Sequence, residues 1–257
     1  FNATSGTISY TDLTQLKNIP SYPYLTGSLL GISRLSWQNL SLTVGDSRHL
    51  LTQQSLSLPK KKLGLLSGSN GSGKSTFFNA LAHQTVYNGS VQFDQKPTEK
   101  LKLKIWAKQL GLVFQLATDQ FVTMTVQEEL SLSQKYSLQP LYWTKTRIDQ
   151  AVKFLNLSDV SNHIVYQLSG GQQKKVQTLA MLIMAQPIML FDEPLAGLDE
   201  QSSIALLKLI KQSIQDLEQT GLMISHQRSN LADYVDYELI LAHKAIQLAE
   251  EVSTCIK

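Results

Sequence analysis

The sequence predicts an α/β fold with a mostly parallel sheet, and two observations lead to this prediction. Short apolar runs typical of buried strands alternate with segments whose apolar residues recur every three or four positions, as on one face of a helix. One of these apolar runs leads directly into a glycine-rich stretch that opens a helix. Strands that alternate with helices are typical of a parallel sheet covered by helices.

The elements are expected in a definite order along the chain. Strands are predicted at residues 35–44, 49–58 and 63–67, at a short run that ends at 113–114, at 188–191 and, as the last core strand, at 222–225. Helices are predicted at residues 74–83, 124–136, 145–156, 171–185 and 202–217. Residues 1–30 carry proline and glycine among polar residues without a clear period, which is typical of a linker.

The composition fits one large domain or two small ones and excludes several classes of protein. Hydrophobic residues make up 42% of the 257 residues and charged residues 17%, with a net charge of +3. This is too apolar for a disordered chain and too weakly basic for a dedicated nucleic-acid binder. The longest apolar run, residues 179–185, is shorter than the 18 or so residues of a membrane span. A single cysteine, Cys255, excludes an internal disulfide and a cysteine-based zinc site, and with no signal peptide we expect a reducing compartment.

A phosphate-binding loop is predicted at residues 68–75, where GSNGSGKS fits the pattern G-x-x-x-x-G-K-[ST] between a strand and a helix. Its glycines let backbone N–H groups turn toward phosphates, and the helix adds the positive end of its dipole. We expect Lys74 to reach the β- and γ-phosphates and the Ser75 hydroxyl to bind Mg²⁺. An ordinary flexible loop would not explain the flanking elements. The residues expected to bind the nucleotide here are Gly68, Ser69, Asn70, Gly71, Ser72, Gly73, Lys74, Ser75 and Thr76.

Two carboxylates follow the buried run at residues 188–191 and fit a Walker B element. We expect Asp192 to hold Mg²⁺ through water and Glu193 to act as the general base for the attacking water. The alternative is that the pair only caps the next helix. The loop at 68–75 favours the catalytic interpretation.

A second anion-seeking helix start is predicted at residues 168–172, LSGGQ, which precede the helix at 171–185. Ser169, Gly170, Gly171 and Gln172 would face a phosphate there. The alternative is an ordinary glycine-containing helix cap. One self-contained site would not need two separate phosphate-facing helix starts.

These motifs resemble those of ATP-binding-cassette (ABC) ATPases, over about residues 33–250. Gln115 stands where that family has its Q-loop glutamine, residues 196–199 match its D-loop with Asp199 at the end, and His226 matches its switch histidine. The resemblance implies a RecA-like P-loop NTPase core with an antiparallel β subdomain and a helical subdomain inserted at about residues 116–170. The expected domains are therefore a linker, or a remnant of a longer chain, at 1–31 and an ABC ATPase domain at 32–257.

The resemblance also implies how the site works. Two such domains would pack head to tail, with each ATP between the loop at 68–75 of one domain and the LSGGQ segment of the other. Gln115 would bind Mg²⁺ and sense the attacking water, and His226 would contact the γ-phosphate. The expected catalytic residues are thus Glu193, His226 and Gln115, and the expected metal ligands are Ser75, Gln115 and Asp192. Asp199 joins the residues expected to contact the nucleotide.

The segment at residues 111–130 is similar to ATPases of energy-coupling-factor (ECF) importers, in which it lies near the groove for the membrane subunit. By this resemblance the chain would be the second cassette of a tandem protein. Two departures stand out. Thr43 and Val44 occupy the place where the family carries an aromatic residue that stacks on adenine, and residues 116–118 replace the common Asn-Pro-acid run.

The resemblance implies an ATPase that energises import of a vitamin, vitamin precursor or metal ion, with ATP and Mg²⁺ as cofactors. The expected partners are a second ABC ATPase domain (identical copy, paralogue or tandem half), an integral membrane transporter subunit and a small substrate-binding membrane subunit, without nucleic acid. The chain is expected to be peripheral, at the cytoplasmic face of the membrane. The alternative, a soluble ABC ATPase that acts on ribosomes or DNA, shares the motifs but is disfavoured because the only basic run is at 60–62.

Overall fold

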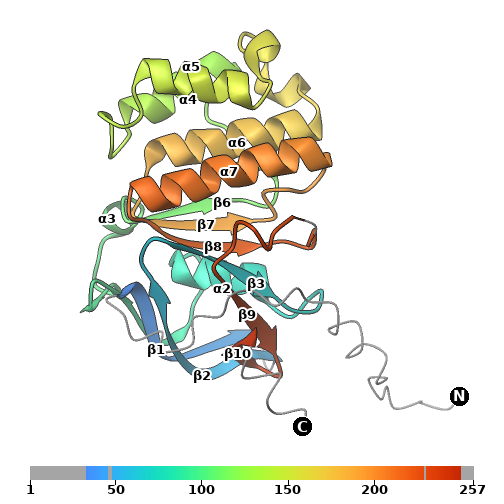
Figure 1. The fold of residues 1–257 in the computed structure, drawn as a ribbon. Helices are drawn as coiled ribbons and strands as arrows, with labels where there is room; N and C mark the ends of the chain where they lie inside the picture. The colour runs from blue at the N-terminus through green and yellow to red at the C-terminus, as the bar shows by residue number, and fades with distance from the viewer. Residues whose placement is uncertain (1–32, 46–47, 229, 250–257) are drawn as a thin grey trace, which may run out of the picture.

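The computed structural model describes residues 33–45, 48–228 and 230–249, and it confirms the predicted α/β class. Figure 1 shows a central sheet with helices on both faces, a second sheet at one end of the molecule and two short helices, α4 and α5, at the other. The linker predicted at residues 1–31 and the lone cysteine, Cys255, lie outside the described residues.

The central sheet has six strands in the order β10-β9-β3-β8-β7-β6. These strands are β3 (Lys62–Ser67), β6 (Leu110–Val113), β7 (Ile188–Asp192), β8 (Thr220–Ile224), β9 (Tyr237–Ala242) and β10 (Ala245–Leu248). The pairings from β9 to β6 are parallel, and β10 runs antiparallel to β9. Because the carboxyl ends of parallel strands meet at one edge, the loops after β3, β6, β7 and β8 gather at that edge.

One expectation about this sheet is wrong, because the strand predicted at 222–225 is not the last core strand. β9 follows it in the chain and pairs with the other side of β3. Glu238 interrupts the apolar run of β9 in the sequence, yet its side chain is fully buried. Its carboxylate accepts a hydrogen bond of 2.8 Å from the Arg228 guanidinium, and this pairing allows a charged residue in a core strand.

The second sheet is antiparallel, with the order β2-β1-β4-β5. Its strands are β1 (Ser33–Val44), β2 (Arg48–Pro59), β4 (Asn88–Phe93) and β5 (Lys96–Pro97). The two strands predicted at 35–44 and 49–58 are confirmed as β1 and β2, which pair antiparallel along their length. β4 and β5 have no predicted counterpart, since β4 starts with exposed residues and β5 is two residues long.

All five predicted helices are found, and α3 has no predicted counterpart. The helices are α2 (Lys74–Leu81), α3 (Leu103–Trp106), α4 (Val126–Lys135), α5 (Lys145–Phe154), α6 (Gly170–Met184) and α7 (Glu200–Asp216), with short 3₁₀ turns at η2 (Ala117–Asp119), η3 (Ser158–Val160) and η4 (Val165–Gln167). Helix α2 ends before the expected residue 83, because His83 adopts a left-handed φ of 60°. Among the described residues, no helix combines the length and the apolar character that a membrane crossing requires.

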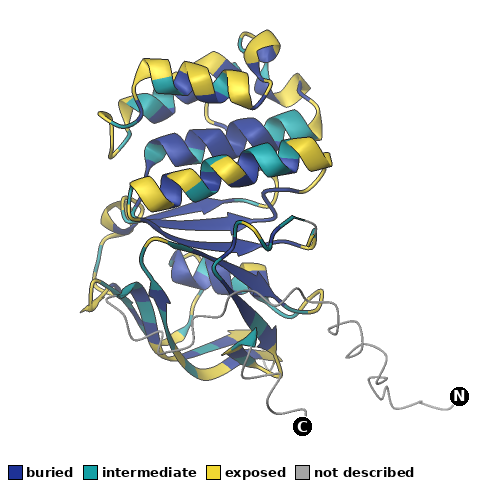
Figure 2. Ribbon diagram, viewed as in Figure 1, coloured by how far each residue is buried: buried dark blue, intermediate teal, exposed yellow. Residues whose placement is uncertain are grey.

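Two hydrophobic cores fix the sheet edge in place, one on each face (Figure 2). On one face the antiparallel sheet packs on α2, where the rings of Trp37 and Phe77 meet edge to face at 5.1 Å. On the other face α6 and α7 cover the sheet, and α4 packs on α6. Strands β7 and β8 are buried along their whole length, so the groups at their ends are held rigidly.

Candidate active site

The loop of residues 68–73 connects β3 to α2 at the carboxyl edge of the sheet. Gly68, Gly71 and Gly73 have positive φ angles of 148°, 73° and 107°, a region that favours glycine. A Cβ on Gly68 would lie 2.5 Å from the carbonyl oxygen of Leu241, so no larger residue fits there. Gly73 caps α2 without a side-chain hydrogen bond, which leaves N–H groups of the first helical turn available to an anion.

Lys74 folds back over this loop. Its Nζ donates hydrogen bonds to the carbonyl oxygens of Gly68 at 2.9 Å and Ser69 at 3.1 Å. Burial lowers the pKa of Lys74, and the carboxylates of Glu193 and Asp192 oppose that shift. The ammonium group is therefore held within the ring of backbone amides where a phosphate would bind.

Two carboxylates stand at the end of β7, opposite the loop. Asp192 is the last residue of the strand, and Glu193 follows with a left-handed φ of 51°. The Ser75 hydroxyl lies near the Asp192 carboxylate and lowers its pKa, against the larger effect of burial. Burial raises the pKa of both Asp192 and Glu193 above the usual values of carboxyl groups. The desolvated carboxylates thus favour a nearby cation or a proton.

The donor set at this place fits Mg²⁺. Asp192 Oδ1 is buried and has no hydrogen-bond partner among the described residues, so one hard oxygen is free to bind a cation. The Ser75 hydroxyl lies beside it, and Gln115 lines the same cleft. A carboxylate, a hydroxyl and an amide oxygen are ligand types that Mg²⁺ prefers, with water completing its shell.

His226 follows β8 and reaches the same carboxylate pair. Its backbone N–H donates to Glu193 Oε2 at 3.2 Å, and its Nε2 lies 3.4 Å from Glu193 Oε1. The His226 side chain is 57% exposed, so it also faces the solvent side of the cleft. The backbone contact fixes the Glu193 side chain while the imidazole remains accessible.

These groups line one cleft of about 580 Å³. The predicted site residues in it are Asn70, Gly71, Gly73, Lys74, Ser75, Thr76, Gln115, Asp192, Glu193 and His226. Gly68 and Ser69 lie next to the cleft, because their carbonyl oxygens accept hydrogen bonds from Lys74. The Ser72 hydroxyl is buried and has no hydrogen-bond partner among the described residues.

Three residues of the β1–β2 hairpin complete one end of the cleft, and of these the sequence had indicated only Val44. Val44, Arg48 and Leu50 line it, and the Arg48 guanidinium donates to the Gly71 carbonyl at 2.7 Å. None of the three is aromatic, in line with the departure noted at Thr43 and Val44. Arg48 and Leu50 could be placed there only from the fold, because no sequence motif includes them.

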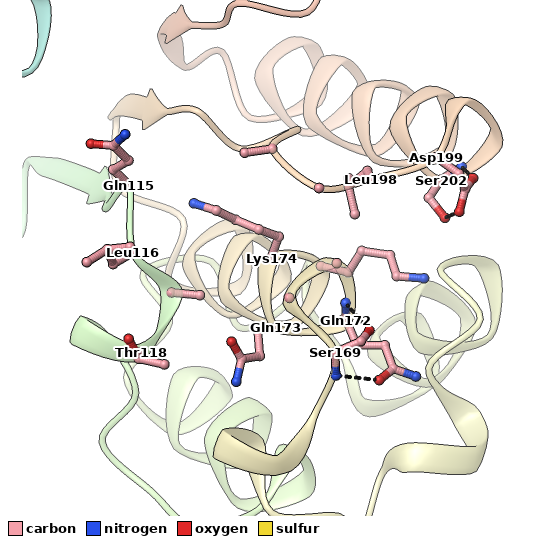
Figure 3. A pocket seen from close by; sticks show the side chains of 16 residues that line it. Gln115, Leu116, Thr118, Ser169, Gln172, Gln173, Lys174, Leu198, Asp199 and Ser202 are labelled. Carbon is pink, nitrogen blue, oxygen red and sulfur yellow. Dashed lines mark hydrogen bonds between the residues drawn. The ribbon is translucent and has the colours of Figure 1, made fainter.

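The remaining predicted residues lie in a second cavity, of about 710 Å³, at the N-terminus of α6 (Figure 3). It is lined by Ser169, Gly170, Gly171, Gln172 and Asp199. The start of α6 is held by two reciprocal bonds: the Ser169 N–H donates to Gln172 Oε1 at 3.0 Å, and the Gln172 N–H donates to Ser169 Oγ at 3.3 Å. Asp199 caps α7 by accepting the Ser202 N–H at 2.7 Å.

The predicted residues therefore form two sets in one chain. Lys74, Ser75 and the two carboxylates share the first cleft, whereas the start of α6 and Asp199 share the second cavity. Gln115 lines both. The structure does not bring Ser169 and its neighbours to the phosphate-binding loop of the same chain.

Comparison with known proteins identifies the family of this chain. Residues 51–196 match the model of the family described as ABC transporter. The chain is 34% identical, over 194 residues, to the energy-coupling factor transporter ATP-binding protein EcfA2 of Staphylococcus saprophyticus, covering 72% of this chain and 66% of that protein. It is 31% identical over 212 residues to YkoD of Bacillus subtilis, named provisionally as an HMP/thiamine import ATP-binding protein. That match covers 82% of this chain but only 38% of YkoD's length.

Among solved structures, cbiO1 of Clostridium perfringens, part of the ABC transporter complex cbiONQ, has the same fold. The TM-score is 0.72 at 24% identity, and the match covers 87% of this chain and 92% of that one. The family match takes in the loop at 68–75, the signature at 168–172 and both carboxylates. The chain therefore belongs to the ABC transporter family, whose ATP-binding domains hydrolyse ATP.

Proposed function

We propose that this chain is an ATP-hydrolysing cassette that energises import of a small nutrient through a separate membrane subunit. One observation carries the proposal: the chain has two incomplete, complementary half-sites that share Gln115. The first offers a phosphate cradle, a lysine and two carboxylates. The second offers a free helix start with the amides of Gly170 and Gly171.

Two half-sites of this kind complete each other when two domains face head to tail. ATP seated on the loop at 68–75 of one domain would then present its γ-phosphate to the start of α6 of the other. The second domain is an identical copy, a paralogue or the other half of a longer protein. The last possibility is supported by YkoD, because the match to this chain covers only 38% of that protein's length.

Hydrolysis would use the groups of the first cleft. The amides of the loop and Lys74 bind the β- and γ-phosphates, and Glu193 accepts a proton as the water oxygen bonds to the γ-phosphorus and the bond to the β-bridging oxygen breaks. Ser75, Gln115 and Asp192 would hold Mg²⁺, which neutralises phosphate charge when bound. His226 Nε2 lies 3.4 Å from Glu193 Oε1, so His226 would orient that carboxylate. Its exposed imidazole would contact the γ-phosphate.

A surface next to Gln115 is suited to the membrane partner. Leu116, Val122 and Met124 are exposed by 62%, 76% and 58% in a segment that is otherwise firmly held. The buried Glu129 carboxylate accepts hydrogen bonds from the N–H groups of Val122 at 3.0 Å and Thr123 at 2.9 Å. Contiguous apolar patches on a surface mark docking sites, and by this proposal these three side chains contribute to one.

The names of two relatives support a nutrient importer, since EcfA2 is an energy-coupling factor transporter protein and YkoD is named for HMP/thiamine import. By this proposal the chain lies at the cytoplasmic face of the membrane as a peripheral protein. A small substrate-binding membrane subunit would choose the cargo, which is a vitamin, a vitamin precursor or a metal ion.

Affinity purification of the full-length protein from detergent-solubilised membranes, followed by mass spectrometry, tests the proposal. We expect one large membrane subunit together with a small, very hydrophobic one. The Lys74→Ala protein, purified in parallel, should retain these subunits and lose ATP binding. Recovery of ribosomal or DNA-bound proteins, with no membrane subunit, would overturn the transporter assignment and leave the nucleotide site intact.

A further inference from the structure

The residue just before Gln115 has both of its backbone groups bound by side chains. Strand β6 ends at Val113, so the N–H and C=O of Phe114 lie beyond the sheet ladder. The Phe114 N–H donates to Gln120 Oε1 at 3.1 Å. Its carbonyl oxygen accepts from Lys174 Nζ at 3.0 Å and from Gln177 Nε2 at 2.9 Å.

These three side chains also bind one another, and we refer to Gln120, Lys174 and Gln177 as the Phe114 clamp. Gln177 Nε2 donates to Gln120 Oε1 at 2.7 Å, and Lys174 Nζ donates to Gln177 Oε1 at 3.3 Å. Gln120 Nε2 donates in turn to the Leu112 carbonyl at 3.0 Å. Lys174 and Gln177 are buried, with exposed fractions of 5% and 1%. A satisfied buried network of this kind holds its members in one arrangement.

Burying an ammonium group costs free energy unless hydrogen-bond acceptors and nearby negative charge compensate it. The negative charges near Lys174 are those of the two carboxylates of the candidate active site. Burial lowers the pKa of Lys174 to about 8, and the charges of Asp192 and Glu193 oppose the shift, so the lysine lies within electrostatic reach of both carboxylates. Figure 3 shows the Lys174 side chain extending from α6 toward the backbone segment after β6 that carries Gln115.

Lys174 also lies one helical turn from the start of α6. Gly170 and Lys174 are four residues apart, so they fall on the same face of the helix. A shift of that helix start would therefore move the Phe114 carbonyl through a direct hydrogen bond, and Gln115 with it.

We infer that Lys174 is a positioning residue for ATP hydrolysis, which ties the start of α6 to the backbone that carries Gln115 and so sets Gln115 against the catalytic carboxylates. The inference rests on the proposed function, because it requires Gln115 and Glu193 to act in hydrolysis. It assigns Lys174 no contact with the nucleotide. Its loss should therefore slow turnover without weakening nucleotide binding at the loop of 68–75.

The test compares four full-length proteins: wild type, Lys174→Met, Gln115→Ala and the double variant. For misplacement of a catalytic group we expect kcat to fall on the order of tenfold in each single variant. The affinity of Lys174→Met for a non-hydrolysable ATP analogue should stay within about twofold of wild type, because Lys174 does not contact the nucleotide and acts only on kcat. The double variant should lose little more than the single variants, because both changes act on one group.

Two further variants keep the test decisive. Lys174→Arg restores a buried cation and donor, so it should recover most of the turnover, whereas Lys174→Gln keeps a donor and loses the charge and should not. If Lys174→Met lowers expression or thermal stability, the comparison of Lys174→Arg with Lys174→Gln stands alone.

Unchanged kcat in Lys174→Met or Lys174→Gln, or fully multiplicative losses in the double variant, would overturn the inference. Glu193→Gln measured in the same series separates this failure from that of the proposed function. Normal turnover in Glu193→Gln would remove the assigned base itself. Loss of turnover there, beside normal turnover in Lys174→Met, would reject the role of Lys174 alone.

Discussion

His226 and Glu193 meet at the end of the central sheet, with the imidazole Nε2 3.4 Å from Glu193 Oε1 and the His226 N–H bonded to Glu193 Oε2 at 3.2 Å. The contact comes from adjacent parallel strands, since β7 and β8 pair and Asp192 lies opposite Ile224. The carboxylate is therefore oriented by backbone that the sheet holds rigidly, and its chemistry can be tested by substitution.

Substitution of Glu193 by glutamine should cut turnover by about 10²–10⁴-fold, which is the usual contribution of a general base. The amide has nearly the same shape and accepts the His226 N–H, but it cannot take a proton from water. ATP affinity, measured by calorimetry, should remain, because Lys74 and the loop amides are untouched. Turnover within threefold of wild type would show that Glu193 is not the base.

As pH is lowered, ATP turnover should begin to fall at a higher pH than it would with a general base of ordinary carboxylate pKa. Burial raises the pKa of Glu193, while the N–H and the imidazole of His226 lower it. Only the ionised carboxylate can accept a proton, so turnover falls as pH drops through this raised pKa. Replacement of His226 by alanine removes the charge that lowers the pKa, so the fall in turnover should move further toward neutral pH. A fall at an unchanged pH would contradict the coupling of the two residues.

Asp192→Asn should separate Mg²⁺ binding from folding. Burial raises the pKa of Asp192, so the ionised carboxylate lowers the stability of the folded protein at neutral pH. The neutral amide of Asp192→Asn should therefore raise the melting temperature measured without Mg²⁺. In wild type, ATP with Mg²⁺ should stabilise the fold by about 2.7 kcal/mol at a hundredfold excess over Kd. The variant should lose the part of this gain that depends on Mg²⁺. An equal Mg²⁺ effect in both proteins would exclude Asp192 as a ligand.

Two glycine substitutions should behave in opposite ways. Alanine at Gly68 would place Cβ 2.5 Å from the Leu241 carbonyl oxygen at a φ of 148°, so the variant should be strongly destabilised. Alanine at Gly170 meets no atom within 4 Å and is favourable in a helix, so it should keep the wild-type melting temperature. Thermal unfolding of both variants provides the comparison. Equal stability of the two would contradict the close packing of the loop after β3.

The sequence predicted which residues come together in the first cleft because these groups belong to short local motifs. Residues 68–75 and the pair at 192–193 each follow a buried strand, and parallel strands bring their ends to one edge. β9 was not predicted, because the partner that makes Glu238 acceptable in a core strand, Arg228, is recognisable only in the fold.

The Phe114 clamp was beyond prediction for a related reason. Lys174 and Phe114 are 60 residues apart, and their bond depends on where β6 ends and how α6 lies on the sheet. In the sequence, Lys174 is one of two adjacent lysines in a helix, and nothing marks it as buried. Long-range polar contacts of this kind follow from packing rather than from local pattern.

The exposed residues Val122 and Met124 provide the last prediction, on docking to the membrane subunit. Two hydrogen bonds hold the backbone of their segment. The Val122 N–H donates to the Glu129 carboxylate at 3.0 Å, and the Met124 carbonyl accepts the Val165 N–H at 2.9 Å. A glutamate at either position would therefore change the surface without disturbing the fold or the nucleotide cleft. We expect Val122→Glu and Met124→Glu to keep ATP affinity and melting temperature and to lose the membrane subunit in detergent pull-downs.

A matched control is a glutamate at Leu141, which is 93% exposed and lies outside this segment. It should leave recovery of the membrane subunit unchanged. Burying a glutamate against an apolar partner is costly, since a desolvated charge needs a counter-ion, so even one substitution should weaken docking measurably. Full recovery of the membrane subunit with both variants would place the docking surface elsewhere on the molecule, while the two half-sites and Gln115 would keep their roles in hydrolysis.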